Sequence, residues 1–101
     1  MTTFEAIVEP NRREILSLLR IREHTVGELA AATKLSQPLI SKHLRALREA
    51  DLVEARSDAQ RRIYRLQLEG FHEIAEWVVP LLKFWTDRFN ELETHLETSN
   101  D

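Results

Sequence analysis

The sequence has no cysteine, and among its 101 residues there are only two glycines and three prolines. Without cysteine the chain cannot form a disulfide, a thiolate metal site or a thiol redox switch. Two glycines are too few for a glycine-rich phosphate-binding loop, and no nucleophile is paired with a base in a known catalytic spacing. The composition therefore argues against an enzyme and indicates a binding protein.

Long apolar runs are also absent, and none approaches the roughly 20 residues that a membrane-spanning helix needs. The N-terminus lacks the basic and apolar regions of a signal peptide. Hydrophobic residues make up 43% of the chain, which is ordinary for a globular protein. We expect one domain, no membrane association and a cytoplasmic location.

The net charge of −3 hides an uneven distribution of charged residues. Residues 34–65 hold eight cations and four anions, a balance of +4, whereas residues 69–101 hold eight anions and two cations, a balance of −6. Such asymmetry indicates a basic binding face with an acidic region held away from it, as in proteins that read nucleic acid.

A segment in the middle of the chain predicts a helix with two opposed faces. Ser36 is a suitable N-cap and Pro38 falls in the first turn, while Ile40, Leu44 and Leu47 recur at helical spacing and face inward. The outward face carries donors and cations, namely Gln37, Ser41, Lys42, Arg45 and Arg48. This pattern suits insertion into a DNA major groove. Taken alone, it also fits an ordinary amphipathic surface helix.

Three shorter helices are predicted before this segment. The first spans residues 3–8, and Pro10 opens the second. Thr25 and Glu28 have the spacing of a capping box at the start of the third, over residues 26–33. This third helix and the donor-rich helix, joined by a tight turn, form the helix-turn-helix pattern.

Arg12 and Arg13 lie near the start of the second predicted helix. The helix dipole disfavours cations there unless they bond to an anion. We expect them to bond either a phosphate or a carboxylate, with Glu9 and Glu14 as the local candidates.

Beyond residue 51 the periodicity changes to that of strands. Residues 52–56 and 61–68 show some alternation, and residues 57–60 read as the connecting turn. A hairpin directly after a recognition helix is a wing, and its Arg56, Arg61 and Arg62 are placed to contact phosphates or a minor groove. Exposed arginine on edge strands also deters unwanted pairing, which is the alternative reading.

A last helix is predicted from Phe71 to about Leu96, with Pro80 expected to kink it or divide it at Val79. Its apolar residues recur every three or four positions, and a domain of this size cannot bury them all. We therefore predict a homodimer. Its interface is expected to contain Phe4, Ile74, Val78, Leu82, Trp85, Phe89 and Leu92. The alternatives are a helix that folds back on its own chain and, for Trp77, Phe84 and Trp85, an apolar effector pocket.

With these elements in order, the chain resembles the ArsR-type winged-helix repressors, in particular their metal-independent, autorepressor-like branch. The resemblance covers about residues 4–96, and its matching motifs lie at residues 9–16, 26–30, 35–44, 47–53 and 61–66. It implies a homodimer that binds a pseudo-palindromic operator, often in its own promoter, and represses transcription.

The resemblance also implies roles for individual residues. The base-reading positions are Gln37, Pro38, Ser41 and Lys42. Phosphate contacts or further edge readers are His43, Arg45 and Arg48, and the wing contacts are Arg61 and Arg62.

The sequence departs from the family pattern at three turns: Asp51 and Ala59 replace residues that are usually glycine, and Lys34 replaces a glycine or asparagine. Aspartate tolerates a left-handed backbone well, so we expect the turn at Asp51 to form. Alanine tolerates it less well, so the sequence does not define the conformation of the wing turn at Ala59. Metal-sensing members carry a cysteine pair or an Asp and His set that this chain lacks, because Asp87 has no histidine two residues on. We expect no metal and no cofactor; His72 and His95 read as surface histidines.

The predicted fold is mainly α with a small β-hairpin: a winged helix-turn-helix core over about residues 10–68, flanked by dimerisation helices over residues 1–9 and 70–97. The predicted partners are double-stranded DNA and a second copy of the chain, and the sequence identifies no small-molecule effector. The alternative is a winged-helix module that binds an acidic protein and lacks sequence-specific DNA binding.

Overall fold

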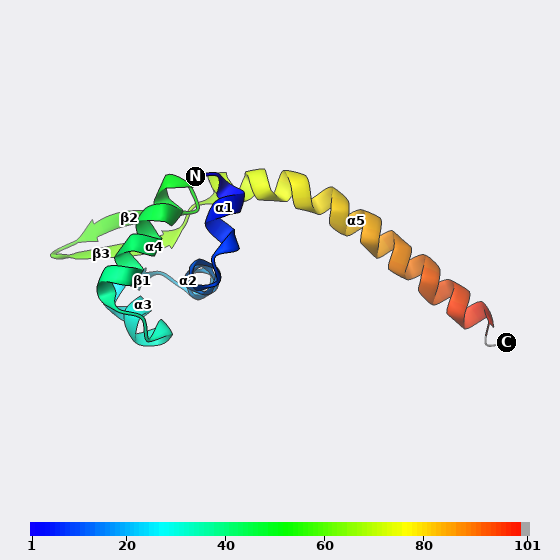
Figure 1. Ribbon diagram of the computed structural model, residues 1–101, viewed down its shortest axis with the longest axis horizontal. Helices are drawn as coiled ribbons and strands as arrows, with labels where there is room; N and C mark the ends of the chain where they lie inside the picture. The colour runs from blue at the N-terminus through cyan, green and yellow to red at the C-terminus, as the bar shows by residue number, and fades with distance from the viewer. Residues whose placement is uncertain (100–101) are drawn as a thin grey trace.

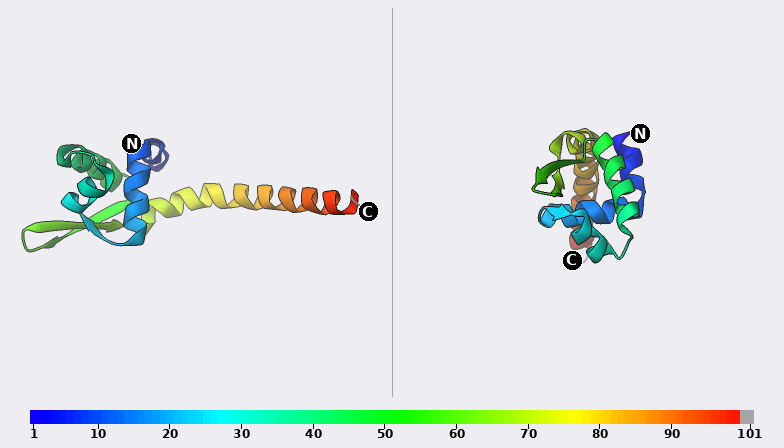
Figure 2. Two further views of the ribbon diagram at one scale, coloured as in Figure 1. Left: turned by 90° about the horizontal axis from the view of Figure 1, so that it is seen from below. Right: turned by 90° about the vertical axis from the view of Figure 1, so that its left-hand side faces the viewer.

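The computed structural model describes residues 1–99 as a compact body with one long arm (Figure 1). The elements are α1 (Thr3–Val8), α2 (Pro10–Ile21), β1 (His24–Thr25), α3 (Val26–Thr33), α4 (Gln37–Glu49), β2 (Val53–Asp58), β3 (Arg61–Leu66) and α5 (Leu68–Ser99). Two further views show that the first four helices and the strands gather at one end of the molecule (Figure 2). The expected mainly helical fold with a small hairpin is confirmed.

The helix starts follow the caps that the sequence predicts. Pro10 lies in the first turn of α2, and the Ser36 hydroxyl caps α4. At α3 the capping box is complete, because the Thr25 hydroxyl accepts from the Glu28 N–H at 3.2 Å and the Glu28 carboxylate accepts from the Thr25 N–H at 2.9 Å. That backbone hydrogen bond, with the Arg22 guanidinium beside it, lowers the pKa of Glu28 to about 2.

The side chains of Arg12 and Arg13 donate to backbone carbonyls and not to the expected carboxylates of Glu9 or Glu14. Arg12 donates to two carbonyl oxygens at the end of α1, at 2.6 and 3.2 Å, and Arg13 donates to two others at 2.8 and 2.7 Å. Together they pair the carbonyls of residues 5–8, the last four of α1. A helix leaves these carbonyls unpaired and negatively polarised, which is why two cations at the start of the next helix stabilise the corner.

One core lies between the helices and the sheet. The apolar face of α4 is its centre, since Ile40, Leu44 and Leu47 are at most 1% exposed. Ile15 of α2 and Leu29 of α3 are fully buried in the same cluster. The inward stripe predicted for α4 is therefore confirmed.

The sheet is antiparallel with the strand order β1-β3-β2. The sequence predicted the hairpin but not β1, whose His24 and Thr25 pair with Tyr64 and Ile63. The hairpin is also tighter than expected, because the pairing continues to Asp58 opposite Arg61 and leaves a loop of two residues. A two-residue strand has no periodicity of its own, so only the fold reveals it.

The three turns with unusual residues all have a left-handed backbone. The φ angles are 64° at Lys34, 57° at Asp51 and 57° at Ala59. The turn at Asp51 survives as expected, and Ala59 adopts the same region at the tip of the wing. A residue with a Cβ pays about 1–2 kcal/mol in this conformation, so the surrounding structure imposes these turns.

Helix α5 is continuous through Pro80, so the expected division at Val79 is wrong, and its ribbon curves gently (Figure 1). Only its first turns pack on the body, where the Thr3 hydroxyl donates to the Glu73 carboxylate at 2.9 Å and the rings of Phe4 and Trp77 meet edge to face. The rest extends away, so the alternative that α5 folds back on its own chain is also wrong. Among the described residues, none of the helices is long and apolar enough to cross a membrane.

Gly70 lets the start of α5 approach the end of α4. Its N–H donates to the Asp51 carbonyl at 2.9 Å. A Cβ at this position would lie 2.5 Å from the Ala50 carbonyl oxygen and 2.8 Å from that of Asp51, both of which belong to the backbone. At the other glycine, Gly27, a Cβ would make only ordinary van der Waals contacts, 3.9 Å from the Thr25 Oγ1 atom and 4.0 Å from the Gln37 Nε2 atom.

This contrast predicts opposite effects of the same substitution at the two glycines. Gly70→Ala is expected to lower the free energy of unfolding by about 2 kcal/mol or more, because backbone must move. Gly27→Ala is the matched control and is expected to be neutral or stabilising by up to about 1 kcal/mol. Urea unfolding measures both, and equal effects would contradict the close approach at Gly70.

Candidate nucleic-acid interface

The outer face of α4 presents a row of donors and cations to solvent. Gln37, Ser41, Arg45 and Arg48 are exposed, and they follow one another at intervals of three or four residues on the side opposite the buried stripe. Lys42 is exposed beside them, and Pro38 is exposed in the first turn. The helical pattern of the sequence therefore predicted this face correctly, and all five of its residues are exposed: Gln37, Ser41, Lys42, Arg45 and Arg48.

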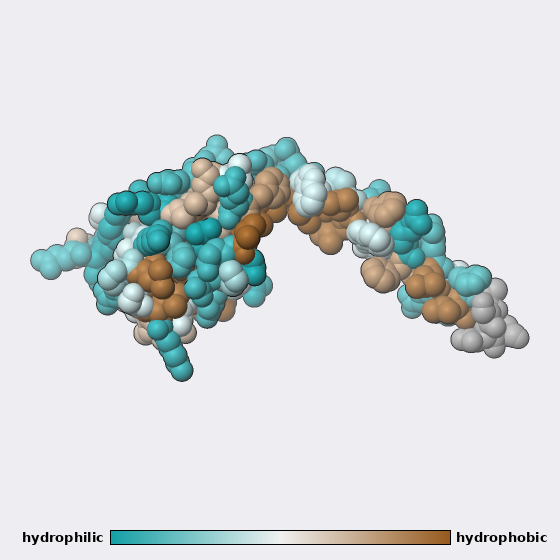
Figure 3. Space-filling model, viewed as in Figure 1, coloured by the Kyte–Doolittle hydropathy of each residue, from teal (hydrophilic) through white to brown (hydrophobic). Residues whose placement is uncertain are grey.

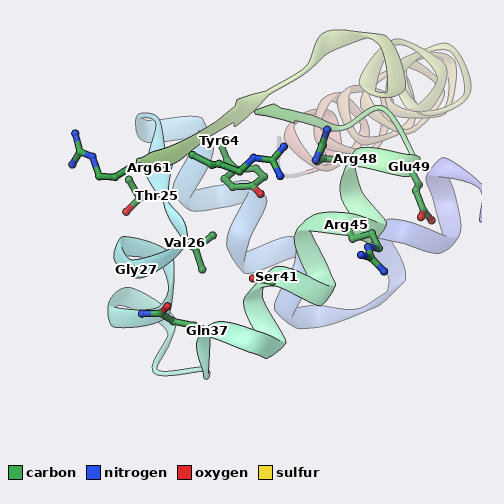
Figure 4. Close-up of a pocket in the computed structure, with 11 residues that line it drawn as sticks. Thr25, Val26, Gly27, Gln37, Ser41, Arg45, Arg48, Glu49, Arg61 and Tyr64 are labelled. Atoms are coloured by element: carbon green, nitrogen blue, oxygen red, sulfur yellow. The ribbon is translucent and has the colours of Figure 1, made fainter. Parts of the chain in front are cut away.

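A groove of ≈ 880 Å³ separates α4 from the wing. Its α4 side includes Gln37, Ser41 and Arg45, and its far side is formed by the beginning of β3 and the first turn of α3. Figure 4 shows side chains from these elements around one hollow. The helix-turn-helix and the hairpin thus form one continuous surface.

The cations of this surface are available to a ligand. Within residues 1–97, whose side chains are described, Lys42, Arg45 and Arg48 take part in none of the ion pairs. They make no side-chain hydrogen bond there either. Three unpaired cations on one helix face give a positive surface that favours a polyanion.

The two wing arginines lie on opposite faces of β3. Arg62 is on the same face as the buried Tyr64, and its guanidinium lies 5.8 Å from the centre of the Tyr64 ring. Arg61 belongs to the other face, bonds Asp58 at 3.3 Å, and points away from α4 in Figure 4. Successive strand residues alternate in direction. Both arginines line the groove, but Arg62 is the one on the strand face that carries the buried Tyr64.

Arg56 lies on the outer face of the hairpin and is already occupied by an anion. It donates to the Glu23 carboxylate at 2.9 Å, and beside it Arg65 donates to Glu54 at 2.6 Å. This ion pair competes with the expected contact between Arg56 and phosphate. The alternative reading, in which exposed arginine on an edge strand deters unwanted pairing, fits the place of Arg56 on the edge strand β2.

His43 is not on the outer face, which corrects its expected role as a DNA contact. The residue is 7% exposed, and its Nε2 atom lies 3.9 Å from the Glu9 carboxylate at the corner between α1 and α2. Neither ring nitrogen has a hydrogen-bond partner. Position 43 falls one residue before Leu44 and three after Ile40, so the helical period carries it inward.

The residues expected at a dimer interface divide into two groups. Phe4, Ile74 and Val78 are partly buried where α5 meets the body. The remaining four are 53–66% exposed and belong to the extended part of α5: Leu82, Trp85, Phe89 and Leu92. Figure 3 shows hydrophobic side chains following one side of the arm. An apolar surface of this extent on one chain marks an interaction site.

The fold and the basic groove define a winged helix-turn-helix of the DNA-binding type. A family model described as bacterial regulatory protein, arsR family, matches residues 9–55. The transcriptional repressor SdpR of Bacillus subtilis is 33% identical over 76 residues, which cover 75% of this chain and 84% of the repressor. The regulator Rv2034 of Mycobacterium tuberculosis is 36% identical over 83 residues, covering 82% and 75% of the two chains.

Comparison with solved structures points to the same kind of protein as the sequence relatives do. A crystal structure described as a possible transcriptional regulator for arsenical resistance has a TM-score of 0.69 and 38% identity, and the match covers 94% of this chain and 96% of that one. The chain belongs to the ArsR family of bacterial regulatory proteins. This is a family of transcriptional regulators and not of enzymes, as the sequence predicted.

Proposed function

We propose that this protein is a homodimeric transcriptional repressor that acts in the cytoplasm and binds a pseudo-palindromic operator through α4. The observation that carries the proposal is the two-faced burial of α4. Its inner stripe is locked in the core, while Lys42, Arg45 and Arg48 stand unpaired on the outside. A buried helix whose outer face carries a row of donors and cations fits the major groove.

Within the groove, the first turns of α4 read base edges. Gln37, Ser41 and Lys42 supply hydrogen-bond donors, and the exposed Pro38 ring supplies an apolar contact for a thymine methyl group. Arg45 and Arg48 lie further along the helix and bind the flanking phosphates, which position the protein on the duplex.

The wing contacts the adjacent DNA backbone or minor groove, and its two arginines contribute unequally. Arg62 is held by the Tyr64 ring, whereas Arg61 is paired with Asp58 on the opposite face of β3. We assign the main contact to Arg62 and a supporting one to Arg61.

A second copy of the chain covers the apolar face of α5. Leu82, Trp85, Phe89 and Leu92 form the exposed part of the contact, and Phe4, Ile74 and Val78 continue it toward α1. Two copies carry two α4 helices, which matches a site made of two half-sites. SdpR is named a repressor and HlyU of Vibrio cholerae an activator. We propose repression, in which the dimer occupies promoter DNA.

The direct test is titration of the protein with duplex DNA from upstream of its own gene at increasing salt. The logarithm of the binding constant is expected to fall linearly with the logarithm of salt, with a slope of about −0.9 for each phosphate neutralised. An unrelated duplex is the control for specificity. Absence of binding at low salt would remove the proposal and would favour the alternative of a protein-binding module.

Lys42→Ala and Arg45→Ala are each expected to abolish operator binding and leave the fold intact, because both side chains are exposed and unpaired. Arg20→Ala removes an exposed cation from α2 and is the matched control. Fluorescence anisotropy measures affinity, and circular dichroism checks the fold. Wild-type affinity in the α4 variants would show that α4 does not read DNA.

Removal of the two wing arginines is expected to have unequal effects. Arg62→Ala should weaken binding about tenfold or more, since a desolvated contact to a charged group is worth about 1.5–3 kcal/mol. Arg61→Ala should cost less, because Asp58 already neutralises this side chain. Anisotropy titrations at one salt concentration measure both, and a larger loss for Arg61→Ala would contradict the assignment of the wing faces.

Trp85→Ala is expected to raise the dissociation constant of the dimer by at least about tenfold, because buried tryptophan is a typical interface hot spot. Leu68→Ala is the control, since Leu68 is 82% exposed at the start of α5 and outside the apolar row. Sedimentation equilibrium measures the dissociation constant. An unchanged dimer in the Trp85 variant would place the interface elsewhere.

A further inference from the structure

The contact between His43 and Glu9 joins α4 to the corner of α1 and α2. His43 is the one buried imidazole of α4, and its side chain is only 9% exposed. Glu9 ends α1 and caps α2, where its Oε2 atom accepts from the Arg12 N–H at 2.8 Å. The same Oε2 atom lies 3.9 Å from His43 Nε2, too far for a hydrogen bond.

The neutral ring suits this place better than the charged ring. Neither nitrogen of His43 has a hydrogen-bond partner, so the neutral ring is already buried at some cost. A protonated ring would carry two N–H donors and a full charge into the same site. Among the described residues, the one anion that acts on it is Glu9, whose nearer oxygen is occupied by the cap of α2.

The charges around the ring add to this preference. Burial is the largest cause that lowers the pKa of His43, and the Arg12 and Lys42 cations lower it further. The Glu9 carboxylate opposes them and raises the pKa, but does not reverse the shift. Arg12 belongs to α2 and Lys42 to α4 itself; among the described residues, no charged group of α3, β2 or α5 acts on the ring.

We propose that the buried, unpaired His43 ring makes the docking of α4 acid-sensitive, so that proton uptake by His43 weakens the attachment of this helix to the α1–α2 corner, an effect that the Glu9 carboxylate moderates. The sign follows from linkage. The unfolded chain takes up a proton at the ordinary histidine pKa of about 6.5, whereas the folded chain resists it. The stabilisation is therefore complete above that pH and is lost as the pH falls below it.

Proton uptake by His43 thus affects the helix that carries Gln37, Ser41, Lys42 and Arg45. In mild acid a larger fraction of molecules has α4 detached from its core. The inference concerns the fold alone, so it stands or falls independently of DNA binding.

The test compares the free energy of unfolding at about pH 7.5 and about pH 5.5, a range that spans histidine titration. Wild type is expected to lose more stability on acidification than His43→Gln, which keeps a polar side chain but does not titrate. His72→Gln is the matched control, because His72 is exposed and pairs with Glu76. The His72→Gln variant should lose as much stability on acidification as wild type does. All variants are compared at one protein concentration, since dimerisation changes apparent stability.

Glu9→Gln separates this inference from a merely structural role of His43. The amide oxygen can still cap α2, but the charge that favours protonated His43 is gone, so the loss on acidification should exceed that of wild type. Parallel losses in wild type and His43→Gln, or a smaller loss in Glu9→Gln, would overturn the proposal.

If His43→Gln does not fold, proton NMR of the wild-type imidazole rings gives the answer directly. The His43 ring is expected to titrate below the ordinary histidine pKa of about 6.5. A His43 pKa at or above that value would overturn the inference.

Discussion

The burial of one stripe of α4 is the constraint on which the rest of the structure depends. Ile40, Leu44 and Leu47 are almost completely removed from solvent, and each buried side chain of this size contributes about 1.5–3 kcal/mol. This burial fixes the rotation of the helix about its axis. The opposite face of α4 must then point to solvent. Its donors and cations are directed outward by the orientation of the helix and not by contacts that they make themselves. Helices α2 and α3 and the sheet complete the core against this stripe.

A second set of contacts links α4 and its neighbouring helices to the arm. Two arginines of α2 bind the end of α1, and α1 in turn contacts α5 through the Thr3–Glu73 hydrogen bond and the Phe4–Trp77 ring pair. Gly70 brings the start of α5 against the last turn of α4. The first turns of α5 thus have a defined position relative to α4. In the proposed dimer, this relation sets the distance between the two reading helices.

Local signals in the sequence predicted most of the elements. Caps and first-turn prolines gave the helix starts, and the spacing of Ile40, Leu44 and Leu47 gave the inner face of α4. Features that depend on residues far apart in the sequence were not predictable: strand β1 exists only because Tyr64 is beside it, and Arg12 and Arg13 find their partners only once α1 folds over them. His43 was misplaced because it lies at the border between the two faces. The difference between Arg61 and Arg62 required the register of the hairpin, which Asp58 and Arg61 extend to the tip.

The central claim is that two copies of α4, set by the α5 interface, read two half-sites of a duplex. Selection of bound sequences from a pool of random duplex DNA tests it most directly, because the pool assumes no operator. The account predicts an enriched motif with two-fold symmetry and half-sites separated by about one helical turn, 10–10.5 base pairs, or a multiple of it. A pool without enrichment, or a single motif without an inverted repeat, would contradict the account.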